Sequence, residues 1–166
     1  MKFVDSSEGI SYRSLGIKVQ NLADYLDSMG IRKGDKVALL GENAPEWGIS
    51  YLAVICSGAV VVPILPDFHS GEIMSIIEHA ECKLMLTSSR QKTRLEQEKL
   101  SVPVQLITYD TDNLKSQIDE STGEVPRSLC MNCTSNLVNE EDLAAIIYTS
   151  GTTGSSKGVM LSHKNI

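Results

Sequence analysis

The chain has 166 residues, enough for one domain that buries roughly 70% of the surface its unfolded form would expose. Hydrophobic residues make up 42% of it, an ordinary fraction for a folded globular protein, which argues against general disorder. A total of 15 Lys and Arg against 21 Asp and Glu gives a net charge of −6 with no basic cluster. We therefore expect no nucleic-acid partner.

The amino-terminal half predicts two helices that alternate with strands. Ser11 is a suitable cap for a helix that Gly30 ends, with apolar residues at helical spacing at Leu15, Val19, Leu22, Ala23, Leu26 and Met29. A strand is expected at 36–40. Pro45 suits the first turn of a second helix that ends near Gly58, and the β-branched run 60–62 follows as a strand.

The second half continues the same alternation. A third helix is expected from Ser70, with Ile73, Ile76, Ile77 and Ala80 on one face, and a charged fourth helix over 89–99. Further strands are expected at 84–86, 104–107 and 144–148. This rhythm predicts an α/β fold: a mainly parallel sheet with helices on both faces, in three αβα layers. The polar stretch 109–142 indicates a surface excursion.

One uncharged stretch raises the question of whether the chain spans a membrane. The 20 residues from Trp47 to Pro66 carry no charge and are long enough to span a bilayer. Ser57 and Gly58 interrupt the stretch, and Pro63 falls near its end, so we interpret it as a helix followed by a buried strand. A membrane span remains the alternative, and peripheral membrane contact is left open. Residues 1–5 show no signal or transit pattern, which favours a cytoplasmic location.

The most informative segment is the loop at 148–158. It combines three glycines, six Ser or Thr hydroxyls and one lysine in the order Tyr-Thr-Ser-Gly-Thr-Thr-Gly-Ser-Ser-Lys-Gly. Glycines let backbone N–H groups converge on an anion, the hydroxyls add donors, and Lys157 adds a full positive charge. The flanking runs 144–148 and 159–161 predict a strand on either side. The segment therefore favours a phosphate-binding loop, and the alternative is a flexible linker.

This loop is not the P-loop of nucleoside triphosphatases. In that motif the lysine follows a glycine, a Ser or Thr comes next, and a helix begins at once. Here Lys157 precedes Gly158, and a strand is predicted to follow. The macrodipole of a helix is therefore not expected to be the main attraction for the anion.

The segment from Ile146 to Lys157, continued by 158–160 and 162–165, resembles the phosphate loop of the adenylate-forming superfamily, which includes acyl-CoA synthetases, aryl-CoA ligases and peptide-synthetase adenylation domains. The segments 10–15, 30–38, 43–47 and 58–63 also resemble the amino-terminal half of that family, in order. The chain is thus identified as the amino-terminal part of an AMP-binding domain over 1–166. The resemblance implies ATP, Mg²⁺ and coenzyme A as co-substrates or cofactors of the parent enzyme.

By the same resemblance, the parent enzyme activates a carboxylic acid with ATP and passes the acyl group to coenzyme A; we expect a long-chain fatty acid. The residues expected to contact the phosphates are Thr149, Ser150, Gly151, Thr152, Thr153, Gly154 and Lys157. The Thr149 hydroxyl is also expected beside Mg²⁺. No catalytic residue is assigned within the chain, and the chain alone is expected to bind ATP weakly and to turn nothing over.

Two departures from the family pattern qualify this expectation. Ser156 stands where the family more often has proline, a change that loosens the loop but removes no phosphate donor. The family's enzymes also continue for several hundred residues beyond the point that matches Ile166. The alternatives are a non-catalytic nucleotide-binding or interaction module and an amino-acid adenylation domain. Residues 66–72 lack the Tyr-Pro pair usual in the latter, which favours an acyl-CoA synthetase.

Cysteine and histidine give weaker signals. Cys130 and Cys133 have the spacing of a metal or redox pair but lack two further ligands, because Cys56 and Cys82 lie in predicted core elements; two free thiols are the simpler interpretation. Ser162 is expected to cap a helix beside His163, for which a role as catalytic base is the alternative. His69 and His79 show no evident partner in the sequence.

Overall fold

The structure is a computed structural model, and it describes residues 9–99, 101–112, 114–115, 138–149 and 157–166. Helices and strands alternate along the chain, as the sequence predicts. In order they are α1 (Tyr12–Ser28), β1 (Lys36–Leu40), α2 (Pro45–Cys56), β2 (Val60–Ile64), α3 (Ser70–His79), β3 (Cys82–Thr87), α4 (Ser89–Gln97), β4 (Gln105–Thr108), β5 (Leu143–Thr149), β6 (Lys157–Ser162) and a 3-10 helix, η2 (His163–Asn165).

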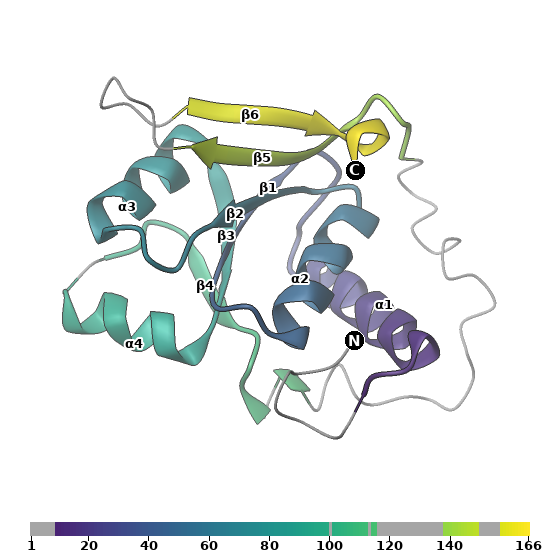
Figure 1. The fold of residues 1–166 in the computed structure, drawn as a ribbon, viewed down its shortest axis with the longest axis horizontal. Coiled ribbons are helices and arrows are strands. Elements are labelled where there is room, and N and C mark those ends of the chain that lie inside the picture. Colours follow the sequence, from purple (N-terminus) through teal and green to yellow (C-terminus); the bar gives the residue numbers. More distant parts are fainter. Residues whose placement is uncertain (1–8, 100, 113, 116–137, 150–156) are drawn as a thin grey trace.

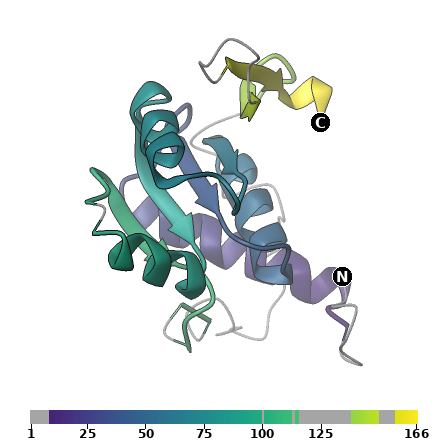
Figure 2. The ribbon, with the colours of Figure 1, turned by 60° about the vertical axis from the view of Figure 1, so that its left-hand side comes forward.

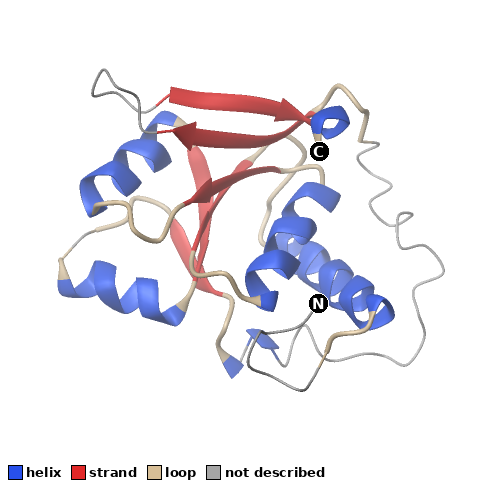
Figure 3. Cartoon of the chain, viewed as in Figure 1, coloured by secondary structure: helices blue, strands red, loops and turns tan. Residues whose placement is uncertain are grey.

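The six strands form one sheet in the order β4-β3-β1-β2-β5-β6 (Figure 1). The pairs from β4 to β5 are parallel, and β6 lies antiparallel to β5 at the end of the sheet. Helices pack on both faces (Figure 3). The predicted α/β class, with a mainly parallel sheet between helical layers, is confirmed. The carboxyl ends of β1 to β5 share one edge, which is where parallel sheets bind ligands.

Alternation along the strands divides the core into two layers. Val37 and Leu39 of β1 face α1 and α2, in a cluster that also holds Val61, Leu84, Leu86 and Ala145. Ala38 and Leu40 point to the opposite face, where α3 and α4 pack, together with Val60, Val62, Met85, Ile146 and Tyr148. Successive strand side chains point to opposite faces, so a strand with helices on both sides must be apolar at every position.

Local signals explain where the helices begin and end. The Ser11 hydroxyl accepts a hydrogen bond from the Ser14 backbone N–H at 3.1 Å and caps α1. Pro45 occupies the first turn of α2. Gly30 and Gly58 follow the ends of α1 and α2 with φ of 85° and 78°, values that a glycine adopts without steric cost. These ends therefore follow from residues that the sequence already shows.

The uncharged stretch from Trp47 to Pro66 contains most of α2 and the whole of β2, which confirms the interpretation as a helix followed by a buried strand. Within the ranges that the structure describes, no helix is long and apolar enough to cross a membrane. Trp47 and Tyr51 stack with ring centroids 5.5 Å apart and pack, partly buried, against the core.

The predicted excursion over 109–142 lies mostly outside the described residues, which leave out 116–137. Its first part is anchored in the core, because Tyr109 is 2% exposed and Leu114 is 4% exposed. The chain therefore does not leave the core directly after β4.

Candidate functional site

The predicted phosphate loop lies between two paired strands. β5 and β6 are antiparallel, with Tyr148 opposite Gly158 and Thr149 opposite Lys157. The predicted strands on either side of the loop are confirmed. Since Thr149 and Lys157 are register partners, the chain leaves β5 and returns to β6 at one place, at the carboxyl edge of the parallel strands.

Two of the predicted phosphate contacts are therefore adjacent. Thr149, also the predicted neighbour of Mg²⁺, and Lys157 form the last residue pair of the hairpin before the loop, and both are exposed. The other predicted contacts, Ser150, Gly151, Thr152, Thr153 and Gly154, lie outside the described residues. An ammonium group at contact distance from a phosphate oxygen gains on the order of 4 kcal/mol at an effective dielectric near 20. Because Lys157 is exposed, the described residues alone do not exclude enough water to give this low effective dielectric.

The base of the hairpin is tightly packed. A Cβ atom on Gly158 would lie 2.9 Å from Cγ2 of Ile146 and 3.3 Å from Cζ of Tyr148. Both neighbours are largely buried, at 9% and 6% exposed. Glycine at 158 thus lets the Tyr148 ring lie directly against β6, which a larger residue would prevent.

The histidine His79, for which the sequence shows no partner, contacts the hairpin. Its Nδ1 lies 2.6 Å from the Tyr148 hydroxyl, and the two rings meet edge to face with centroids 5.7 Å apart. The expectation of no partner is wrong for His79, because a contact between residues 69 positions apart leaves no local pattern in a sequence. Burial raises the pKa of the Tyr148 hydroxyl.

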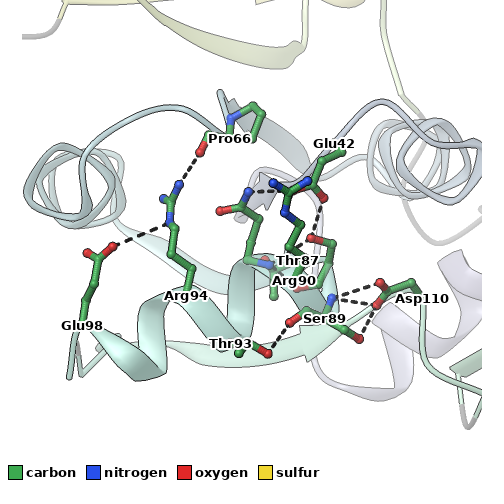
Figure 4. Close-up of polar contacts among 11 residues, drawn as sticks. Glu42, Pro66, Thr87, Ser89, Arg90, Thr93, Arg94, Glu98 and Asp110 are labelled. Carbon is green, nitrogen blue, oxygen red and sulfur yellow. Dashed lines mark hydrogen bonds and ion pairs between the residues drawn. The ribbon is translucent and has the colours of Figure 1, made fainter.

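A polar groove of about 520 Å³ lies at the same edge of the sheet, over α4 (Figure 4). Its lining consists of Glu42 after β1, Pro66 and Asp67 after β2, and Arg90, Gln91, Thr93, Arg94 and Gln97 of α4. Arg94 donates hydrogen bonds to the backbone carbonyls of Pro66 and Phe68 and so holds the segment after β2 against α4.

Glu42 is the centre of the hydrogen-bond network beside this groove. Its carboxylate accepts hydrogen bonds from the Ser88 hydroxyl at 2.8 Å and from Nε2 of Gln91 at 2.7 Å. Burial on its own raises the pKa of Glu42, but these two hydrogen bonds, the backbone N–H of Glu42 and the charge of Arg90 together outweigh it and leave the pKa below its ordinary value. Glu42 is therefore held as a carboxylate.

A second carboxylate fixes the start of α4. Asp110, which follows β4, accepts hydrogen bonds from the backbone N–H of Ser89 at 2.8 Å and from the Ser89 hydroxyl at 2.7 Å (Figure 4). No motif in the sequence marks Glu42, Ser88 or Asp110 as part of a site. The available signal was their position, since each follows closely on a predicted strand and so falls at the carboxyl edge.

The sequence profile described as "AMP-binding enzyme" matches residues 1–166, the whole chain. The chain belongs to this family. The AMP-binding family model thus covers the sheet, both helical layers and the hairpin together.

Curated relatives match over nearly the whole chain. The 4-coumarate--CoA ligase-like 6 of Arabidopsis thaliana is 34% identical over 98% of this chain and 29% of its own length. The crotonobetaine/carnitine--CoA ligase of Salmonella typhimurium is 31% identical over 98% of this chain and 33% of its own length. Bacitracin synthase 3 of Bacillus licheniformis is 29% identical over 98% of this chain and 2% of its own length. The chain therefore spans a third or less of these relatives.

Solved structures of family members share the fold. The N-terminal domain of FACL13 from Mycobacterium tuberculosis superposes with a TM-score of 0.75 at 27% identity, over 92% of this chain and 37% of that one. Apo MatB from Rhodopseudomonas palustris superposes with a TM-score of 0.71 at 29% identity, over 94% of this chain and 30% of that one. The chain has the fold of the amino-terminal subdomain of adenylate-forming enzymes.

After the hairpin, this member of the AMP-binding family forms the short 3-10 helix η2 at the place where the sequence predicts a helix. Ser162 precedes η2, and Oδ1 of Asn165 accepts hydrogen bonds from the Ser162 backbone N–H at 3.0 Å and from its hydroxyl at 2.9 Å. The backbone N–H of His163 donates to the carbonyl of Asp142 at 3.0 Å. Nε2 of His163 is buried and has no hydrogen-bond partner within the described part of the chain.

The cysteine predictions have a mixed outcome. Cys82 of β3 is buried, and burial raises the pKa of its thiol to about 12. Cys56 lies in the core helix α2, as predicted, but it is the last residue of the helix and is exposed. Cys130 and Cys133 lie outside the described residues. Among the residues that are described, no group of three or more His, Cys, Asp or Glu could hold a metal ion.

Proposed function

We propose that the complete protein is an AMP-forming acid–thiol ligase that activates a carboxylic acid with ATP. The carboxylate attacks the α-phosphorus, the bond to the bridging oxygen breaks, and pyrophosphate leaves. The acyl-adenylate then passes its acyl group to the thiol of coenzyme A, and AMP is released. Membership of the AMP-binding family and the names of the CoA ligases among its relatives support this proposal.

In this proposal the hairpin loop holds the leaving group. The observation that carries it is the register pairing of Thr149 with Lys157, which brings a hydroxyl and an ammonium group together at the mouth of the loop. These groups suit a polyphosphate, since both donate hydrogen bonds to anionic oxygens and each charged hydrogen bond contributes roughly 1.5–3 kcal/mol. With Ser150, Gly151, Thr152, Thr153 and Gly154 they would orient the β- and γ-phosphates and stabilise the departing charge.

Mg²⁺ would neutralise part of the phosphate charge, and we place the Thr149 hydroxyl beside it. The loop can supply only several kcal/mol of the roughly 8–23 kcal/mol by which enzymes lower barriers. We therefore propose that residues 1–166 alone bind ATP weakly and do not catalyse the reaction. A cytoplasmic location and a long-chain fatty acid as substrate belong to the same proposal.

Replacement of Lys157 tests the role of the loop. In the complete protein, Lys157→Ala should lower the rate of ATP–pyrophosphate exchange at least tenfold while the midpoint of thermal unfolding stays within about 2 °C of the parent, because Lys157 is exposed and contributes little packing. Lys164→Ala, which removes an exposed lysine beyond β6, is the matched control. Unchanged exchange by Lys157→Ala would refute the assignment. A panel of fatty, aromatic and amino acids in the same assay identifies the substrate class.

Bacitracin synthase 3 among the relatives favours a second candidate, an amino-acid adenylation domain. The two candidates share the first half-reaction and differ in the acceptor thiol. Release of AMP that depends on coenzyme A and a fatty acid supports the ligase. Exchange that depends on an amino acid and ignores coenzyme A supports the second candidate.

A further inference from the structure

Towards its loop end, β5 pairs through its backbone with β6 and not with β2, although Ile146 and Tyr148 still pack in the core layer that faces α3. β5 pairs with β2 at Val61 and Ala145, near the start of β5. From Ile146 to Thr149, β5 pairs with residues of β6. Figure 2 shows the hairpin at the top of the molecule, where it forms the end of the sheet beside β2. The direction in which the hairpin presents its loop therefore depends on contacts other than the parallel strand pairing.

Tyr148 makes such a contact, one residue before the loop end of β5. Its hydroxyl lies 2.6 Å from Nδ1 of His79, the last residue of α3. In Figure 1 the arrowhead of β5 points towards α3. The distance is at the short end for a hydrogen bond between these groups, and one hydrogen is shared between them in either imidazole tautomer.

Both sides of this contact are held in place. Ile73, Ile76 and Ile77 of α3 are at most 1% exposed, so the helix that carries His79 is firmly packed on the sheet. The Tyr148 ring lies against Gly158 of β6, where an added Cβ would come within 3.3 Å of Cζ. A displacement of the Tyr148 ring would therefore displace β6 as well as β5.

We propose that His79 is a positioning residue for the loop: through Tyr148 it aligns the register pair Thr149 and Lys157 for a polyphosphate. This inference rests on the proposed function of the loop. His79 does not touch the ligand; it fixes the angle of the hairpin relative to α3. Loss of the hydrogen bond leaves the fold intact but lets Thr149 and Lys157 sample more orientations. Ligand binding must then order these residues, which lowers the affinity.

The test uses the complete protein and measures the Kd for Mg·ATP and for magnesium pyrophosphate by calorimetry. His79→Leu and Tyr148→Phe each remove the hydrogen bond and should weaken both ligands roughly three- to tenfold, the range that one hydrogen bond spans. His79→Asn places an amide atom near the position of Nδ1 and should restore most of the affinity. His79→Gln reaches the position of Nε2 instead and should not. The double variant should bind no more weakly than either single variant.

Tyr51→Phe is the matched control, since it makes the same change on α2, across the sheet from His79. Its affinities should equal those of the parent, and the unfolding midpoints of all variants should agree within about 2 °C. If His79→Leu binds both ligands as the parent does while Lys157→Ala does not, the positioning role is overturned and the proposed function stands. If Lys157→Ala also binds as the parent does, the proposed function itself fails. Equal losses in His79→Asn and His79→Leu, together with lower unfolding midpoints, would show a structural role only.

Discussion

Replacement of Gly41 by alanine tests the packing at the carboxyl edge of the sheet. Gly41 follows β1, and an added Cβ there would lie 1.7 Å from the hydroxyl oxygen of Tyr109 and 2.9 Å from its Cζ. Tyr109 comes from the far edge of the sheet, just after β4, and is only 2% exposed. Gly41→Ala therefore forces the backbone or the buried ring to move, and the space open to the ring is the cavity of about 230 Å³ that Tyr109 lines with Glu46 and Lys115.

The cost follows from that overlap. Overpacking a well-packed core typically costs 1–3 kcal/mol, and a separation of 1.7 Å between heavy atoms is far inside any tolerable contact. We expect Gly41→Ala to lower the free energy of unfolding by about 2–3 kcal/mol. For a chain of this size, that corresponds to a fall of roughly 4–12 °C in the unfolding midpoint.

The assay is urea denaturation followed by circular dichroism, with Gly71→Ala as the control. A Cβ at Gly71 of α3 meets nothing within 4 Å, and alanine favours a helix, so this variant should be as stable as the parent or slightly more stable. Tyr109→Phe removes the atom at 1.7 Å and should recover most of the stability lost by Gly41→Ala. If Gly41→Ala unfolds at the same urea concentration as the parent, the close packing of Tyr109 on Gly41 is refuted.

Three further predictions concern the same edge and the hairpin. Ser88→Ala removes the cap of α4, in which the Ser88 hydroxyl accepts a hydrogen bond from the Gln91 N–H at 3.2 Å, and it also removes the hydroxyl that donates to Glu42. Urea denaturation should show that the free energy of unfolding falls by about 1–3 kcal/mol. A fall below about 0.5 kcal/mol would contradict the hydrogen-bond network around Glu42. The pKa of Glu42 is held below its ordinary value of 4.5, so its contribution to stability is complete above that pH and is lost as the pH falls through the lower folded value. Glu42→Gln should therefore reduce the loss of stability between about pH 5 and pH 3, whereas parallel urea midpoints of variant and parent over that range would rule the contribution out. Gly158→Ala places a Cβ 2.9 Å from Cγ2 of Ile146 and should lower the free energy of unfolding by about 1–2 kcal/mol; an unchanged urea midpoint would show that the hairpin has room at this position.

Much of the fold follows from local patterns. Ser11, Pro45 and Gly30 mark helix ends because capping and backbone conformation depend on residues only a few positions apart. Apolar runs such as 60–62 mark strands buried on both faces for the same local reason. The candidate loop was found in the same way, since its glycines, hydroxyls and lysine lie within eleven consecutive residues.

Contacts between distant segments could not be found in this way. Glu42 meets Ser88 and Gln91 because β1 and β3 are neighbours in the sheet, and that neighbourhood is not a property of either strand alone. The same applies to His79 and Tyr148, and to Tyr109 over Gly41. The exposure of Cys56 was not predicted either, because the sequence around the last turn of a helix does not show which of its sides the sheet covers.

The amino-acid sequence by itself determined the order and kind of the elements, the mainly parallel α/β class, the hairpin that frames the loop and the family resemblance. Only the tertiary structure decided the strand order β4-β3-β1-β2-β5-β6, the hydrogen bonds that Glu42 accepts beside α4, and the hydrogen bond between His79 of α3 and Tyr148 of the hairpin. The reason is the separation along the chain of the residues that interact. Caps, turns and periodicity are free-energy preferences of a few neighbouring residues, whereas strand order and cross-sheet contacts depend on which apolar surfaces bury one another when the whole chain collapses.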